Sequence, residues 1–173
     1  MLSGSSKPAG WKTYVHVRSS SELSDGIDIQ CWFFYPYNPF IDIPKIAHEG
    51  DWEHITITVN HAGEFHPAWY SQHNTGMKLT RDRLEFVDDS HPVVYSARGS
   101  HASFPNAGSW PLPNMQIYKD VLDVAKKLGF KDIPVADLLT DNTYSDGPKW
   151  HTWKSMINVG EKGQTNKCVA MIL

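Results

Sequence analysis

The sequence predicts a mostly β protein, a β-sandwich with one or two short helices in the C-terminal third. Two observations favour this fold class. Short runs of β-branched and aromatic residues recur along roughly the first hundred positions, with turn-forming residues between them. The pattern changes to helical periodicity only after residue 115.

The strands come first in the chain. Runs rich in valine, isoleucine, threonine and aromatic residues predict strands at 11–17, 27–35, 51–60, 67–73, 79–87 and 93–97. Glycine, proline, asparagine and other polar residues predict the connections at 19–26, 36–50, 61–64 and 88–92. Strands this short and this evenly spaced are typical of a sandwich.

The C-terminal third has a different pattern. Residues 115–128 place apolar side chains on one stripe and predict a helix that Gly129 ends. Residues 133–139 predict a second short helix, 140–149 a polar loop and 169–173 a last strand. At 173 residues the chain fits one domain. We assign residues 1–10 to a flexible leader and 11–173 to a single β-sandwich domain.

Charge and hydropathy exclude some partners. The net charge of −3 gives no electrostatic basis for nucleic-acid binding, which needs a basic surface. No apolar run reaches the ~18 residues of a transmembrane segment. The N-terminus lacks the apolar region of a secretory signal. These features are compatible with a cytoplasmic chain and with a processed or truncated secreted chain, so the sequence does not determine the compartment.

The two cysteines, Cys31 and Cys168, are far apart and form no disulfide framework. We expect two buried thiols. The alternative is a single bridge that ties the C-terminal tail to a core strand.

The strand 51–60 begins with two carboxylates on its apolar side. Asp51 and Glu53 share a face with isoleucines and a valine, while Trp52 and His54 point to the other face. Buried carboxylates are costly unless they are paired or bind a metal. His48 lies just before Gly50, which permits a sharp turn toward the two carboxylates. Residues 48, 51 and 53 therefore predict a divalent-cation site.

The ligand types indicate which ion would bind there. Hard oxygen ligands make Ca²⁺ or Mg²⁺ the expected cofactor ahead of Zn²⁺, which the histidine keeps possible. The competing interpretation is a salt bridge from Asp51 or Glu53 to an arginine such as Arg98, with His48 on the surface.

Other polar residues are candidates for ligand binding or proton transfer. The turn after residue 97 presents Arg98, Ser100 and His101, and His73 ends another predicted strand. Together with Trp52 these four residues are the predicted ligand-binding set. The candidate general acids or bases are His54, His73 and His101. A Ser–His–Asp hydrolase drawn from Ser100, His73 and Asp51 would lack the Gly-x-Ser-x-Gly nucleophile elbow.

The same runs resemble a known family. Tyr14-Val-His-Val-Arg18, the segment 28–38, His48-Glu-Gly-Asp-Trp-Glu-His54, Tyr70-Ser-Gln-His73 and the segment 94–105 occur in the order seen in the vacuolar protein sorting-associated protein 62 family. The family includes plant proteins that carry domain of unknown function 946. The resemblance extends over residues 14–108, with a weaker echo at 147–153. It implies a sorting phenotype and no defined biochemical activity.

A more distant resemblance concerns the metal site. The run Ala47-His-Glu-Gly-Asp-Trp-Glu53 is similar to the Gly-His-Arg-His-Asp-Trp-Glu heptad of the necrosis- and ethylene-inducing-like proteins. These toxins are β-sandwiches that bind glycosylated sphingolipid headgroups. The resemblance implies that His48, Asp51 and Glu53 surround a divalent cation. It also implies a further ligand at Asn38, where those toxins have an aspartate, so the site here has one negative charge fewer.

Three functions therefore compete. The first is a metal-binding module that recognises a lipid headgroup or glycan at a membrane surface, as a toxin-like or sorting-related component. The second is a metal-dependent hydrolase, such as a phosphodiesterase, that uses the same site. The third is a protein-interaction scaffold without metal. The sequence leaves the ligand, the metal and the oligomeric state open.

Overall fold

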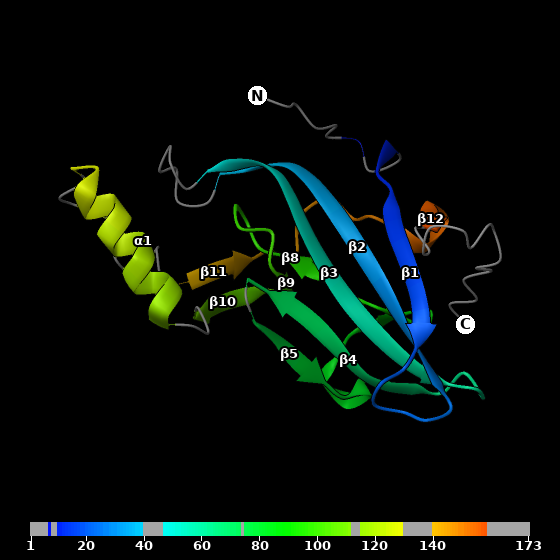
Figure 1. Ribbon diagram of the computed structural model, residues 1–173. Helices are drawn as coiled ribbons and strands as arrows, with labels where there is room; N and C mark the ends of the chain where they lie inside the picture. The colour runs from blue at the N-terminus through cyan, green and yellow to red at the C-terminus, as the bar shows by residue number, and fades with distance from the viewer. Residues whose placement is uncertain are drawn as a thin grey trace.

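The structure is a computed structural model that describes residue 7 and residues 10–39, 47–73, 75–111, 115–129 and 140–158. Its main element is a six-stranded sheet with the strand order β12-β1-β2-β3-β4-β5 (Figure 1). The strands are β1 (Thr13–Ser19), β2 (Gly26–Asn38), β3 (His48–Asn60), β4 (Phe65–Gln72), β5 (Thr75–Leu79) and β12 (Met156–Asn158). Neighbouring strands are antiparallel except β1 and β12, which are parallel.

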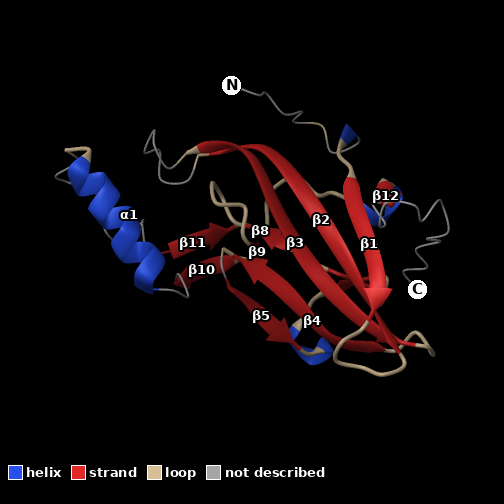
Figure 2. Cartoon of the chain, in the orientation of Figure 1, coloured by secondary structure: helices blue, strands red, loops and turns tan. Residues whose placement is uncertain are grey.

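Three two-stranded sheets accompany the large one (Figure 2). They pair β6 (Phe86–Val87) with β7 (His91–Pro92), β8 (Tyr95–Ser96) with β9 (Ser103–Phe104), and β10 (Gly108–Pro111) with β11 (Thr140–Thr143). The described helices are α1 (Met115–Lys127) and the 3₁₀ turns η3 (Arg81–Arg83) and η4 (Thr152–Lys154). The fold is mostly β with one short α-helix, as the sequence predicts.

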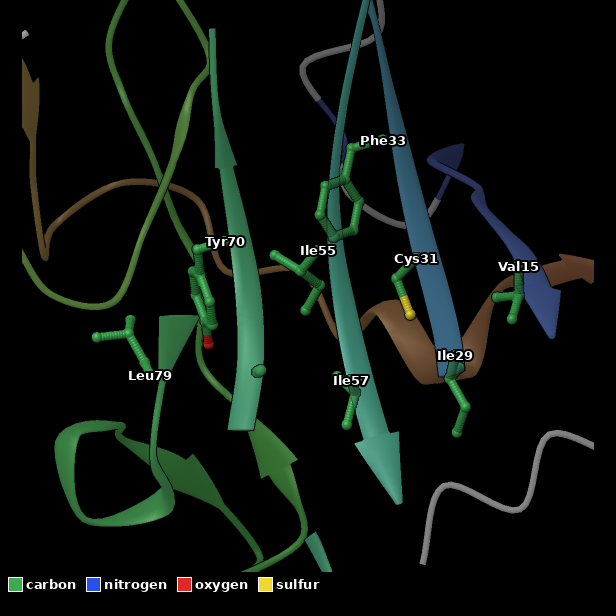
Figure 3. Packing of buried hydrophobic residues seen from close by; sticks show 9 residues of the cluster. Val15, Ile29, Cys31, Phe33, Ile55, Ile57, Tyr70 and Leu79 are labelled. Carbon is green, nitrogen blue, oxygen red and sulfur yellow. The ribbon is translucent and has the colours of Figure 1, made fainter. Parts of the chain in front are cut away.

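The core lies on one face of the large sheet. Alternate side chains of neighbouring strands meet there, and Figure 3 shows them side by side. The buried set is Val15, Ile29, Cys31, Phe33, Ile55, Ile57, Ala68, Tyr70 and Leu79. Leu84, Val94, Trp150 and Met156 pack against this set from the later part of the chain. The segments around β6 to β9 and η4 thus supply a thin second layer over this face of the sheet.

The predicted face assignment of β3 is confirmed. Glu53, Ile55 and Ile57 are buried on the core side, whereas Trp52 is 48% exposed on the other. We call this other side of the six-stranded sheet the outer face. The predicted strands at 11–17, 27–35, 51–60 and 67–73 and the helix at 115–128 are also found, with bounds that differ by a few residues.

Three local predictions were wrong. The strand predicted at 79–87 is interrupted by η3, because the charged run Arg81-Asp-Arg83 offers no apolar alternation and turns instead. The strand at 93–97 shrinks to β8, and the polar loop at 140–149 begins with β11, which pairs with β10. The leader, the helix at 133–139 and the strand at 169–173 lie outside the described residues, apart from positions 7 and 10.

Two further expectations concern the thiols and the membrane. Cys31 is a free thiol in the core, and burial raises its pKa to about 12. Cys168 lies outside the described residues. Among the helices that the structure describes, none has the length and apolar character to cross a bilayer.

Candidate functional site

Three carboxylates on the core side of the sheet form the candidate site. Asp51 and Glu53 come from the start of β3, and Asp141 comes from β11. We call these three residues the acidic cluster. Glu53 and Asp141 are buried and Asp51 is nearly so. Strand alternation brings the first two to the same face, and the pairing of β11 with β10 supplies the third from a distant part of the chain.

Asp51 is the most heavily contacted carboxylate. Its Oδ2 accepts hydrogen bonds from Asn38 Nδ2 at 2.9 Å and from His101 Nδ1 at 2.9 Å. Its Oδ1 lies 3.8 Å from His48 Nε2, which is beyond hydrogen-bond distance. Asn38 and His48 are opposite each other in the register of β2 and β3, and Asp51 follows on β3. The strand pairing therefore brings together Asn38, His48 and Asp51, three of the four predicted metal ligands.

His101 is held in place from two sides. Its ring stacks on Tyr35 with centroids 4.0 Å apart and planes within 1°. Tyr35 pairs with Asp51 across β2 and β3, so the ring that supports His101 stands beside the carboxylate that His101 bonds. The backbone of His101 has a φ of 60°, a left-handed conformation that the tight turn after β8 requires. Burial raises the pKa of Tyr35 to about 12, and the charges of Glu53 and Asp51 add to that rise.

Asp141 holds a second histidine. Its Oδ1 accepts a hydrogen bond from the Ser100 hydroxyl, and its Oδ2 lies 2.9 Å from His73 Nε2. The carboxylate therefore stands between the serine and the histidine. A Ser–His–Asp triad needs the histidine in the middle, where it can take the serine proton. This arrangement does not activate Ser100, and Asp51 bonds His101 and not His73.

Glu53 differs from its neighbours. It is 7% exposed, and no described residue donates a hydrogen bond to it or forms an ion pair with it. Burial, followed by the nearby charges of Asp51 and Asp141, raises its pKa from 4.5 to about 8. Buried carboxylates without partners are uncommon, because the lost hydration is not replaced. Either a proton or a cation can relieve this cost.

Several predicted site residues lie elsewhere. His54 and Trp52 are on the outer face, where His54 stacks on Trp32 with centroids 4.2 Å apart. Arg98 is exposed, and within the described part of the chain it makes no ion pair with Asp51 or Glu53. The alternative of an arginine salt bridge at these carboxylates is thus not seen among the described residues. His73, Ser100 and His101 do reach the cluster.

The site does not present a finished coordination sphere. Across the described ranges, no set of three or more histidine, cysteine, aspartate or glutamate side chains is arranged to hold a metal ion. The reason is visible at Asp51, because Oδ2 is engaged by Asn38 and His101 while His48 stands back from Oδ1. The donor chemistry still suits a hard cation, since no residue that the structure describes donates a hydrogen bond to Asp51 Oδ1 or to the Glu53 carboxylate.

Two residues of the site escaped sequence reasoning. Asp141 fell in a stretch assigned to a polar loop, about ninety positions from β3, and no local pattern marks its partners. Tyr35 was assigned only to a strand. The register of β2 with β3 was the missing signal, since it alone places Tyr35 beside Asp51.

Comparison with known proteins identifies relatives of this chain. The family model described as vacuolar protein sorting-associated protein 62 matches residues 6–126, well over half of the chain. A curated relative in Saccharomyces cerevisiae, the putative vacuolar protein sorting-associated protein TDA6, is 33% identical over 103 residues, which is 47% of this chain and 22% of that protein. Vacuolar protein sorting-associated protein 62 of the same yeast is 28% identical over 153 residues, which is 79% of this chain and 29% of that protein.

The chain thus spans less than a third of the length of either relative. No solved structure matches it. The family match covers the strands and turns that supply Asn38, Asp51, His73 and His101. The chain belongs to the vacuolar protein sorting-associated protein 62 family.

Proposed function

We propose that this chain is a divalent-cation-binding module. The acidic cluster would hold Ca²⁺ or Mg²⁺, and the bound ion would contact oxygen atoms of a lipid headgroup or glycan at a membrane surface. The observation that carries the proposal is Glu53, a buried carboxylate that has no partner among the described residues and stands beside two further carboxylates. A cation supplies the missing partner for Glu53 and offsets the charges of Asp51 and Asp141 beside it.

The side chains of the predicted ligands would need to move only a little to complete the coordination shell of the ion. Asp51 Oδ1 lies 3.8 Å from His48 and accepts no hydrogen bond from the described residues, so an ion there could draw in both side chains. Asn38 would offer its amide oxygen once its Nδ2 released Asp51. The mixture of carboxylate and amide oxygens favours Ca²⁺ or Mg²⁺, and the histidine leaves room for Zn²⁺.

A membrane-related ligand is supported by two further points. The printed names of the yeast relatives refer to vacuolar protein sorting, a process that takes place on membranes. Phosphates and sugar hydroxyls are the oxygen donors that membranes present, and a partly hydrated ion can bind either by exchanging water. No observation favours the hydrolase, since Ser100 is bonded to a carboxylate and not to a base.

The test is co-sedimentation with vesicles in the presence of Ca²⁺, Mg²⁺ or EDTA. One arm uses phosphatidylcholine with a phosphoinositide, a second uses phosphatidylcholine with a neutral glycolipid, and a third uses phosphatidylcholine alone. Binding that requires the cation and is lost in Glu53→Gln supports the proposal. The composition of the vesicles to which the protein binds identifies the headgroup. The matched control is Asp82→Asn, which removes an exposed carboxylate in η3. Equal binding in EDTA, or none in any arm, would refute it.

A further inference from the structure

The outer face of the large sheet carries a cavity that the acidic cluster does not use. Its volume is about 270 Å³, which suits one small ring and not an extended ligand. One row across four neighbouring strands lines it, because Gln30 pairs with Thr56, Thr56 with Trp69, and Trp69 with Lys78. Every second residue of a strand shares a face, so this row points away from the core.

Trp69 forms an open aromatic wall of the cavity. Its side chain is 44% exposed, although tryptophan is usually well buried. The indole lies over Gly76 of β5, where an added Cβ would stand 3.0 Å from Nε1 and 3.1 Å from Cε2. The absence of a side chain at 76 lets the ring rest against the neighbouring strand. The ring is thereby held in position while a large part of it stays accessible.

The charges that line the cavity are already balanced. Arg18 pairs with Asp28 at 3.3 Å, and Lys78 pairs with Glu22. Two positive and two negative side chains leave no net charge for an ionic ligand to complement. His54, the remaining titratable group in the lining, has a pKa lowered by burial and stays neutral at physiological pH. The cavity therefore fits a neutral, polar molecule.

Two neutral polar groups remain available in the same row as Trp69, with Thr56 next to it and Gln30 one strand farther. The Gln30 side chain bonds His16 through its Oε1 at 3.1 Å, which leaves its Nε2 hydrogens for another acceptor. The Thr56 hydroxyl has no hydrogen-bond partner among the described residues. An exposed indole in one row with a hydroxyl and an amide donor matches a sugar, which has an apolar ring face and hydroxyls at its edge.

We infer that this cavity binds a neutral sugar, which stacks on Trp69 and receives hydrogen bonds from Gln30 and Thr56. The site is on the opposite face of the sheet from the acidic cluster and uses none of its residues. It therefore needs no cation, and it extends the proposed function to a second ligand site whose success or failure is independent of the first.

The test is titration of the whole chain, in EDTA, with a panel of neutral oligosaccharides built from glucose, mannose, galactose and N-acetylglucosamine. Tryptophan fluorescence and calorimetry report binding. We expect at least one member to bind, with an affinity about tenfold weaker in Trp69→Ala, the effect of losing one aromatic stack. Thr56→Val, which keeps the side-chain shape, should weaken binding severalfold. The matched control is Phe34→Ala, a similarly exposed aromatic residue outside the cavity lining, which should bind normally.

Two results would overturn the inference. One is the absence of binding by every member of the panel to folded wild-type protein. The other is binding that survives unchanged in both Trp69→Ala and Thr56→Val, with circular dichroism showing that both variants are folded. Attachment of wild type to sugar-free phosphatidylcholine vesicles through Trp69, without any sugar binding, would assign the same face to membrane contact and also refute the inference.

Discussion

His101 and Asp51 are 50 positions apart in sequence, and a hydrogen bond of 2.9 Å joins His101 Nδ1 to Asp51 Oδ2. The bond connects the turn between β8 and β9 to the start of β3, so it links the thin second layer of the sandwich to the large sheet. The Tyr35 ring lies parallel to the imidazole and fixes its plane. One histidine therefore orders the geometry around the acidic cluster.

Replacement of His101 by asparagine should destabilise the fold. Asparagine tolerates the left-handed backbone at this position, so the change removes the ring and its bond to Asp51 while it leaves the turn intact. A hydrogen bond to a charged group stabilises a protein by about 1.5–3 kcal/mol. We expect urea unfolding to show a decrease in the free energy of unfolding within that range. His61→Asn, in the exposed turn after β3, is the control and should unfold like wild type. Equal stability of both variants would show that the His101 contact contributes nothing.

The pH dependence of stability should identify Glu53. Its pKa is raised from 4.5 to about 8 in the folded state, so between these values the folded chain keeps a proton that the unfolded chain releases. Stability from this group is complete below the unfolded pKa and is lost as the pH rises through the folded one, by at most about 1.4 kcal/mol per pH unit. In EDTA, wild type should therefore lose stability from about pH 5 to 8 relative to Glu53→Gln. If the free energy of unfolding changed with pH in the same way in both proteins, a buried and unpaired Glu53 would be contradicted.

Tyr70 tests the contact between the sheet and the second layer. Its hydroxyl donates a hydrogen bond of 2.8 Å to the Val93 carbonyl while its ring is buried in the core. Tyr70→Phe keeps the ring and should lower the free energy of unfolding by about 1–2 kcal/mol, because the carbonyl loses its donor. Tyr144→Phe, at an exposed tyrosine, is the control. An unchanged midpoint in urea for Tyr70→Phe would mean that water replaces the bond without cost.

The Cys31 thiol should react only after unfolding. It is buried in the core and its pKa is raised to about 12 by burial, so almost no thiolate forms at neutral pH. In a Cys168→Ser background, a thiol reagent such as dithionitrobenzoate should label no thiol in the native protein and one in urea. Rapid labelling of native protein would place Cys31 at the surface or in a frequently opened segment.

The sequence was informative where a pattern is local. Alternation along β3 predicted which side of the strand carries Asp51 and Glu53, and the helical stripe predicted α1. The strands of two residues were not predictable, because so short a pairing is decided by tertiary contacts. Asp141 was missed for the same reason, since its role depends on the pairing of β11 with β10. A sequence identifies residue types that can serve as ligands, but it does not show which of them lie close together in the fold.

Thermal unfolding of wild type and Glu53→Gln, in EDTA and with added Ca²⁺, Mg²⁺ or Zn²⁺, tests the cation site most directly. An ion that binds only the folded state raises its stability by about 2.7 kcal/mol at a hundred times the dissociation constant. We predict a rise in melting temperature of wild type with Ca²⁺ or Mg²⁺ that is absent in Glu53→Gln. No rise with any ion, or the same rise in both proteins, would contradict a cation at the acidic cluster and leave Glu53 as a buried, protonated carboxyl group.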